Sequence, residues 1–384
     1  MKKIFCIIIA TVLLMCDISS VWAQEPQIET PSAIVMEAST MTVIYEKNAD
    51  EMLPPASVTK IMTLLLIFDA LEAGTIKLTD EVTVSENAAS MGGSQVFLEP
   101  MEKQTVDTMI KCIAVASAND ASVAMAEHLC GSEEAFVVKM NERAKTLSMT
   151  NTHFVNCCGL DTDGHETTAR DIALMSRELI TKYPQIYNYS TIWMDTITHS
   201  TRRGDSEFGL TNTNKLVKQM EGTITGLKTG STSIAKCCLS ATASKNGIDL
   251  IAVILAAPNS KTRFADAVTL INYGYGICSM YSDENMPALE EVPIKDGIKD
   301  KVTVRYAGDF KHLFTESIDK SKVESRIEYI KDIKAPVNKG DVLGKIVYSY
   351  DGKEIGSVDI QAAEGVKKAS FKDCIRKIYS LYFC

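Results

Sequence analysis

The chain has no surplus of positive charge, no internal repeat and no low-complexity tract. Its 384 residues carry 40 Lys and Arg against 49 Asp and Glu, a formal net charge of −9, and the charges are scattered. Nucleic-acid binding relies on Lys and Arg that neutralise phosphates, so this composition argues against a nucleic-acid partner. The histidines and cysteines also lack the Cys-x-x-Cys or Cys/His spacing of a zinc site.

The cysteines form no obvious disulfide framework. Of the 11, Cys6 and Cys16 lie near the N-terminus, and the nine that follow cannot all pair internally because their number is odd. Cys157-Cys158 and Cys237-Cys238 are direct neighbours, which pair only with strain. We therefore expect mostly free thiols.

The N-terminus has the pattern of a secretory signal peptide. Lys2 and Lys3 precede an apolar run over 4–15, and a small-residue site ends at Ala23. The run is short for a membrane span. We expect a signal peptide over 1–23, cleaved after Ala23. An uncleaved anchor helix and a lipoprotein at Cys16 remain alternatives.

Three motifs in one order carry the chemistry: Ser57-Val-Thr-Lys60, Ser117-Ala-Asn119 and Lys228-Thr-Gly230. Each alone is common, because Ser-x-x-Lys recurs at 317–320 and Ser-x-Asn at 85–87. Neither repeat has the other partners in matching order. Together the three motifs supply a nucleophile, a base, a second hydroxyl, an amide and a cationic strand, which is the set of a penicillin-recognising serine acyltransferase.

Ser57 and Lys60 form the predicted nucleophile and base. A serine hydroxyl needs a neighbouring base, and Lys60 lies one helical turn further on the same face. A lysine accepts a proton only if its pKa is lowered, which burial and a nearby cation, here Lys228, both promote. We expect Ser117 to relay a proton to the departing amine and the Asn119 amide to hold the substrate backbone.

The third motif is expected on a strand that binds a substrate carboxylate. Lys228 and Thr229 offer a charge and a hydroxyl, and Gly230 lets a peptide approach the backbone. The amide N–H groups of Ser57 and Ser231 are the candidates for an oxyanion hole.

Hydrophobic patterns predict an α/β (α+β) architecture, in which a helical block is inserted into an antiparallel sheet. Strands are expected over 33–36, 41–45, 224–229, 237–243 and 250–256, and helices over 61–71, 105–115, 120–130, 133–147, 168–180 and 263–273. Asn246-Gly247 predicts a tight hairpin turn. Beyond Pro287, short alternating segments predict a small all-β domain.

The last 18 residues have the pattern of a basic amphipathic helix. Lys367, Lys368, Lys372, Arg376 and Lys377 accompany an apolar set of Phe371, Ile375, Ile378 and Tyr382. This pattern favours membrane-surface binding, with an ordinary terminal helix as the alternative. The expected organisation is a signal peptide (1–23), a catalytic domain (24–286), a C-terminal β domain (287–366) and an anchoring helix (367–384).

Nearly the whole mature chain resembles the low-molecular-weight penicillin-binding proteins, the serine D-alanyl-D-alanine carboxypeptidases of peptidase family S11. The similar stretches are 55–63, 94–98, 156–165 and 168–171. The chain departs at Ala118, a place often held by glycine, and at Cys157-Cys158, where other residues are usual. Arg263 falls where the family places an arginine near the substrate carboxylate.

This resemblance implies a penicillin-binding transpeptidase/β-lactamase-like catalytic domain that removes the terminal D-alanine from peptidoglycan pentapeptide stems. It implies an acyl-enzyme on Ser57, inhibition by β-lactams, no cofactor, and a location on the extracytoplasmic face of the bacterial cytoplasmic membrane. We interpret His165 as a structural loop residue. A serine β-lactamase is the rival enzyme, although Glu166 lacks that class's Glu-x-x-x-Asn pattern, and a non-catalytic cell-wall-binding protein is the other alternative.

Overall fold

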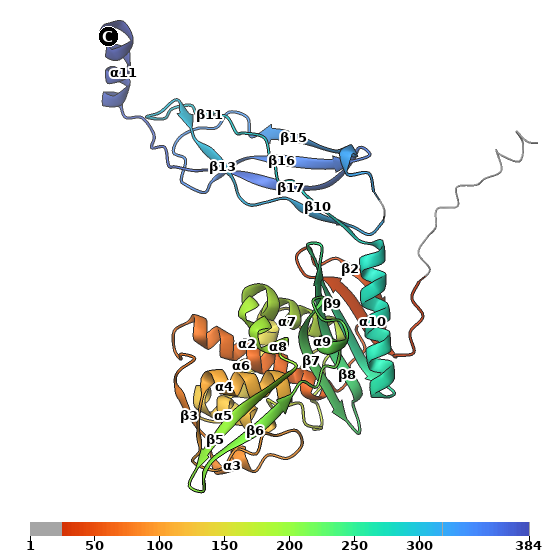
Figure 1. Cartoon of the computed structure of the whole chain (residues 1–384). Coiled ribbons are helices and arrows are strands. Elements are labelled where there is room, and N and C mark those ends of the chain that lie inside the picture. Colours follow the sequence, from red (N-terminus) through yellow and green to blue (C-terminus); the bar gives the residue numbers. More distant parts are fainter. Residues whose placement is uncertain (1–24, 317, 384) are drawn as a thin grey trace, which may run out of the picture.

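The computed structural model describes residues 25–316 and 318–383. The expected signal peptide falls outside them. Figure 1 shows a large N-terminal part, in which helices and a sheet pack together, and a C-terminal part made mostly of strands. No helix among the described residues has both the length and the apolar content needed to cross a membrane.

The N-terminal part is built on a five-stranded antiparallel sheet in the order β2-β1-β9-β8-β7. Its strands are β1 (Ser32–Glu37), β2 (Val43–Lys47), β7 (Ile224–Thr232), β8 (Lys236–Lys245) and β9 (Ile248–Ala257). Strands from the two ends of the domain meet where β1 pairs with β9, which confirms the predicted insertion of a helical block between a strand pair and a strand triplet. Asn246 and Gly247 both have positive φ in the β8–β9 turn, as the predicted hairpin requires.

The helical block covers one face of this sheet (Figure 1). It comprises α2 (Lys60–Glu72), α3 (Glu86–Ala89), α4 (Val106–Lys111), α5 (Asn119–Cys130), α6 (Glu133–Thr146), α7 (Ala169–Lys182) and α8 (Tyr187–Ser190), with the short helices η1 (Ala56–Thr59), η2 (Cys112–Ala116) and η3 (Pro184–Ile186). Most of α2 is buried, as its continuous apolar run predicts. The helix expected over 105–115 is divided, because the α-helix α4 gives way to the π-helical turn η2.

The opposite face of the sheet is covered by α10 (Ser260–Ile277), and α9 (Leu216–Gln219) packs nearby (Figure 1). Side chains alternate between the two faces of a strand. In β1, Ile34 and Met36 therefore join the core of the helical block, while Ala33 and Val35 join the core beneath α10. The sheet thus separates two hydrophobic cores and is fixed from both sides.

Two antiparallel strand pairs of the N-terminal part were not predicted. The first is β3 (Glu81–Thr83) with β4 (Lys103–Thr105), on either side of α3 in the sequence, and the second is the hairpin of β5 (Met194–Thr201) with β6 (Gly204–Thr211). Most β5 and β6 side chains are exposed or only partly buried, and Ile197, His199 and Leu210 are the buried ones. A ribbon with so few buried positions lacks the apolar alternation by which a strand is recognised.

The C-terminal part is a small β structure around a four-stranded sheet in the order β13-β17-β16-β15. Its elements are β10 (Ser279–Ser282), β11 (Val292–Pro293), β12 (Lys301–Val302), β13 (Val304–Tyr306), β14 (Lys311–Phe314), η4 (Lys320–Lys322), β15 (Val323–Tyr329), β16 (Val342–Tyr350) and β17 (Lys353–Ala362), followed by α11 (Phe371–Phe383). β10 precedes Pro287 but pairs with β14. The terminal helix begins at Phe371, four residues after the start of the segment expected to be helical.

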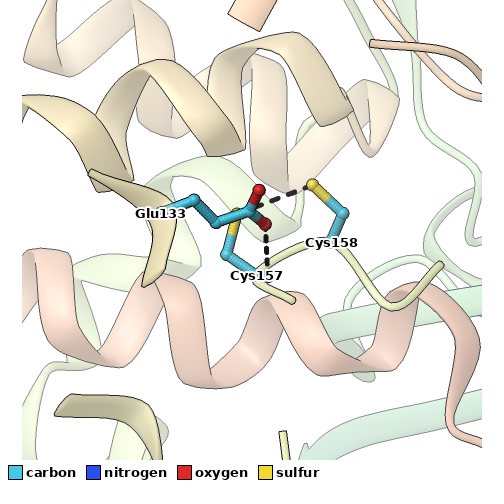
Figure 2. Close-up of side chains that lie close together, drawn as sticks. All are labelled: Glu133, Cys157 and Cys158. Carbon is cyan, nitrogen blue, oxygen red and sulfur yellow. Dashed lines mark hydrogen bonds between the residues drawn. The ribbon is translucent and has the colours of Figure 1, made fainter. Parts of the chain in front are cut away.

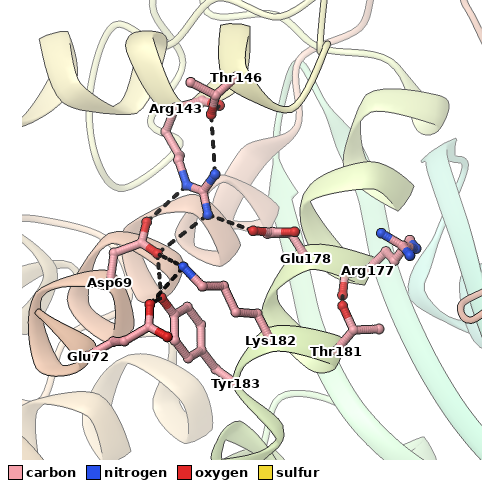
Figure 3. A network of polar contacts seen from close by, with 9 residues as sticks. All are labelled: Asp69, Glu72, Arg143, Thr146, Arg177, Glu178, Thr181, Lys182 and Tyr183. Carbon is pink, nitrogen blue, oxygen red and sulfur yellow. Dashed lines mark hydrogen bonds and ion pairs between the residues drawn. The ribbon is translucent and has the colours of Figure 1, made fainter. Parts of the chain in front are cut away.

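A polar network joins three helices at the edge of the helical block (Figure 3). Asp69 of α2 accepts hydrogen bonds from Arg143 Nε of α6 (2.9 Å) and from the hydroxyl of Tyr183 after α7 (2.5 Å), and Arg143 also contacts Glu178 of α7 at 2.7 Å. Burial alone would raise the pKa of Asp69, but the bonds from Tyr183 and Arg143 outweigh it and lower that pKa. The ionised carboxylate is therefore the form that the fold stabilises.

We expect Asp69→Asn to lower the free energy of unfolding by about 1–3 kcal/mol at neutral pH, since it removes charge-assisted hydrogen bonds. The folded-state pKa of Asp69 lies below its unfolded value, so its stabilisation is complete above the unfolded pKa and disappears as pH falls. The difference in the free energy of unfolding between wild type and variant should therefore become smaller below about pH 4.

Urea unfolding at neutral and acidic pH measures this difference. Glu81→Gln is the matched control, because Glu81 forms an exposed pair with Lys103 and should change stability by less than about 0.5 kcal/mol. A difference for Asp69→Asn that is equally large at both pH values would contradict the assigned role of the carboxylate.

Candidate active site

Ser57 and Lys60 lie where η1 passes into α2. Both helices use right-handed backbone geometry at this junction, which leaves the two side chains one turn apart on the same side. Lys60 Nζ lies 2.9 Å from Ser57 Oγ, and Lys60 is fully buried. The structure therefore brings the predicted nucleophile and base into direct contact.

The Lys60 amine has three oxygen acceptors. Besides Ser57 Oγ, it donates to Asn119 Oδ1 at 2.6 Å and to the backbone carbonyl of Cys158 at 2.8 Å. Burial lowers the pKa of Lys60, and electrostatic interactions with Cys158, Cys157 and Asp120 partly oppose this effect. The site thus removes water from the amine, which favours the neutral form that a base needs, while keeping acceptors for its protons.

Lys228 lies on β7 and is also buried, with Nζ donating to the Thr229 carbonyl at 3.1 Å. Burial, followed by repulsion from Lys60 and Arg263, lowers the pKa of Lys228 well below its usual value. Burial is thus the largest cause of the lowered pKa of both lysines, and repulsion between two ammonium groups would disfavour the charged form of each.

Ser117 and Asn119 occupy the junction between η2 and α5. Ser117 has a left-handed backbone (φ 62°), and its buried hydroxyl has no hydrogen-bond partner among the described residues. The Asn119 amide is engaged at both ends, because Oδ1 accepts from Lys60 and Nδ2 donates to the Gly92 carbonyl at 2.6 Å. The structure therefore gives Asn119 a part in holding Lys60 that the sequence did not suggest.

Gly230 allows a close approach within the protein itself, besides the predicted approach of a peptide. A Cβ added there would lie 2.8 Å from both the Ser57 nitrogen and the Pro55 carbonyl oxygen. The absence of a side chain at Gly230 thus leaves room for the backbone of η1. This contact sets β7 directly against the segment that carries Ser57.

Arg263 on α10 reaches the same end of β7. Its Nη1 donates to the Gly230 carbonyl and to Ser231 Oγ, both at 3.0 Å, and to the Cys238 carbonyl at 3.2 Å. The Thr229 hydroxyl donates to Thr213 Oγ1 at 2.6 Å. The hydrogen-bond acceptors of Lys228 and Arg263 among the described residues are neutral oxygens, so a carboxylate bound here would supply the anionic partner that these two groups lack.

The loop 156–160 and His165 contact η1 and hold it in place. His165 is buried, its Nδ1 accepts from the Val155 amide at 3.0 Å, and its Nε2 contacts Thr59 Oγ1 at 2.8 Å. Burial lowers the pKa of His165 to about 4, so the ring is neutral and its Nε2–H donates to Thr59. These contacts support the interpretation of His165 as a structural residue.

The sequence also missed Gly159 as a residue that positions Ser57. Gly159 has φ +82°, and a Cβ there would lie 1.8 Å from the Ala56 carbonyl oxygen. Positive φ alone costs an L-residue about 1–2 kcal/mol. The clash with η1 makes this position far more restrictive.

We expect Gly159→Ala to destabilise the fold by more than Gly131→Ala does. Gly131 has the same φ of +82° but nothing within 4 Å of an added Cβ, so its substitution should cost about 1–2 kcal/mol. Overpacking against η1 should add a further ~1–3 kcal/mol at Gly159. Urea unfolding of both variants measures the two costs, and equal losses would mean that Gly159 is needed only for its φ.

Comparison with known proteins identifies the family. The D-alanyl-D-alanine carboxypeptidase family, Peptidase_S11, matches residues 19–259, and the C-terminal domain of penicillin-binding protein 5 matches residues 279–368. The chain is 42% identical to D-alanyl-D-alanine carboxypeptidase DacF of Bacillus subtilis, with 89% of this chain and 87% of that protein covered. It is 32% identical to DacC of Escherichia coli, with 91% and 88% covered.

Solved structures agree with this relationship. Penicillin-binding protein 5 of Haemophilus influenzae superposes with a TM-score of 0.78 at 30% identity, covering 90% of this chain and 99% of that one. The D-alanyl-D-alanine carboxypeptidase DacD of Francisella tularensis superposes with a TM-score of 0.68 at 26% identity, covering 89% of this chain and 95% of that one. The chain therefore belongs to the D-alanyl-D-alanine carboxypeptidase family S11, whose members are serine hydrolases.

Proposed function

We propose that this chain removes the terminal D-alanine from peptidoglycan pentapeptide stems, with Ser57 as the nucleophile. One observation carries the residue assignment: the buried Lys60 amine lies 2.9 Å from Ser57 Oγ. This distance is within the reach expected of a nucleophile and its base. The reaction proceeds through an acyl-enzyme, and it needs no metal or organic cofactor.

Acylation begins when Lys60 takes the proton of Ser57 and Ser57 Oγ attacks the carbonyl between the two D-alanines. The resulting ammonium keeps acceptors on Asn119 and Cys158. The amide N–H groups of Ser57 and Ser231 stabilise the oxyanion, because Gly230 sets β7 against η1 at this point.

Ser117 passes a proton to the leaving D-alanine, after which water hydrolyses the ester. Its buried hydroxyl has no hydrogen-bond partner among the described residues, so both its proton and its lone pairs are free for this step. A buried hydroxyl without a partner is costly. A substrate amine that pairs with it would remove that cost.

The terminal carboxylate binds beside β7. Lys228, Thr229 and Arg263 supply charge and a hydroxyl there, with Arg263 already bonded to Ser231 Oγ. The Asn119 Nδ2 group keeps a second N–H beyond its bond to Gly92, and we assign that N–H to the substrate backbone. A β-lactam carries a matching carboxylate and acylates the same serine.

We propose a secreted enzyme attached to the outer face of the cytoplasmic membrane. The proposed units are a signal peptide over 1–23, the catalytic domain over 24–286, the β domain over 287–366 and the terminal helix over 367–384. The pairing of β10 with β14 argues for an earlier start of the β domain, at Ser279 instead of residue 287. Of the predicted apolar set, Phe371 and Ile375 are exposed along α11 and support the membrane contact, whereas the side chains of Ile378 and Tyr382 lie outside the described part of the chain.

Ser57→Ala should abolish both labelling by a fluorescent penicillin and D-alanine release. Lys60→Arg should slow acylation by about 10²–10⁴-fold, since arginine keeps the charge but cannot give up a proton. Stopped-flow acylation and a D-alanine assay on a peptide ending in D-Ala-D-Ala measure these losses.

Lys103→Arg is the matched control, because Lys103 is an exposed lysine paired with Glu81, and it should acylate at the wild-type rate. Penicillin labelling that persists in Ser57→Ala would contradict the assignment of the nucleophile. Rapid turnover of penicillin by the wild type, without D-alanine release, would instead identify a β-lactamase.

Truncation after Ser370 should give an enzyme that no longer binds membranes but retains peptide turnover. The cut belongs there because residues 367–369 bond to the β domain, through Ile298 N to the Lys367 carbonyl and Ala369 N to the Asp296 carbonyl. Each lysine near an anionic surface contributes roughly 1 kcal/mol, so binding by the full chain should weaken with salt.

Flotation with anionic liposomes, at low and high salt, compares the full chain with the truncated one. Ile375→Ala in the full chain tests the apolar contribution separately. Equal flotation of full and truncated forms would refute the anchor, and lost turnover on truncation would refute the separation of the helix from the chemistry.

A further inference from the structure

Two buried thiols and a carboxylate meet beside the catalytic lysine (Figure 2). Cys157 Sγ and Cys158 Sγ lie 3.6 Å apart, and one carboxylate oxygen of Glu133 lies within 4.8 Å of both. The same carboxylate accepts from the Cys157 amide at 2.9 Å. Both cysteines are fully buried, whereas Glu133, the first residue of α6, is partly exposed and gives the cluster a side that faces solvent.

The geometry suits a shared metal ion better than a disulfide. Neighbouring residues have Cα atoms about 3.8 Å apart, which is less than the roughly 4.4 Å that an ordinary disulfide requires. Two sulfurs bound to one Zn²⁺ at about 2.3 Å with tetrahedral angles lie roughly 3.8 Å apart. The observed sulfur separation is close to that value, so a cation needs little movement of either side chain.

The loop that carries the two cysteines is also arranged as the backbone around a metal site would be. The loop backbone is fixed, because Asn156 Oδ1 accepts from the amides of Cys158, Gly159 and Leu160. Soft thiolates select thiophilic ions such as Zn²⁺ and Cd²⁺ over Mg²⁺ or Ca²⁺.

We propose that Glu133, Cys157 and Cys158 form a binding site for a thiophilic divalent cation of the Zn²⁺ class. The three residues supply three ligands, water completes the coordination, and binding releases the thiol protons to solvent. The ion would be structural, since the Cys158 carbonyl that accepts from Lys60 belongs to the same residue as a ligand. Occupancy therefore fixes the loop that positions the catalytic amine.

Cadmium titration of the reduced, metal-free full chain tests this site. Cd²⁺ should give thiolate-to-metal absorption in the ultraviolet that saturates at one tight equivalent, Zn²⁺ should displace it, and Zn²⁺ should raise the melting temperature. Cys157→Ser and Cys158→Ser should each weaken Cd²⁺ binding by more than about tenfold, and Glu133→Gln by about tenfold. The melting shift with Zn²⁺ should be lost in the two serine variants.

Cys237→Ser is the matched control, because Cys237 and Cys238 are also neighbours but lie on β8, where side chains alternate between faces. It should bind Cd²⁺ like the wild type. Penicillin acylation checks that each variant is folded, and the metal readouts do not depend on peptidase activity. Tight binding that survives in Cys157→Ser, or that is lost in Cys237→Ser, would overturn the proposal.

Discussion

The site depends on one buried amine and the three oxygens that hold it. Lys60 Nζ is bonded to Ser57 Oγ, Asn119 Oδ1 and the Cys158 carbonyl. These acceptors come from η1, from the first residue of α5 and from a loop, so three segments must meet at a single atom. A buried N–H left without its acceptor costs about 1–3 kcal/mol, which links the folding of all three segments to the geometry of the proposed base.

Close backbone packing supplies that geometry. Gly230 on β7 and Gly159 in the loop 156–160 both touch the backbone of η1 and leave no room for a Cβ. β7 is in turn the edge strand of a sheet fixed by a hydrophobic core on each face. The sheet therefore forms one wall of the site, the helical block carries the base, and the two are held at a separation that only glycine permits.

Much of this arrangement was predictable from sequence because it is local. Ser57 and Lys60 are one helical turn apart, and the strand triplet, its Asn246-Gly247 turn and the buried α2 all have strong patterns. What escaped prediction involves backbone atoms or tertiary partners: the Cys158 carbonyl, the bond from His165 to Thr59, and the contact of Gly230 with the backbone of η1. Every residue has a backbone carbonyl, so the sequence does not show which carbonyl will accept a hydrogen bond. The exposed β5–β6 hairpin lacks the alternating apolar residues that would predict its strands.

The loop 156–160 shows why the unpredicted contacts matter for function. Cys158 bears the acceptor for Lys60 on its carbonyl, and the same residue places its sulfur beside Cys157 and near the Asn119 carbonyl. Asn119 itself holds Lys60 from the other side. A metal ion bound to the two thiols would thus affect both residues that hold the Lys60 amine. It would bind Cys158 directly and would lie close to the backbone carbonyl of Asn119. Glu133 is partly exposed, so the cluster reaches solvent at a residue that is separate from those proposed to bind the substrate.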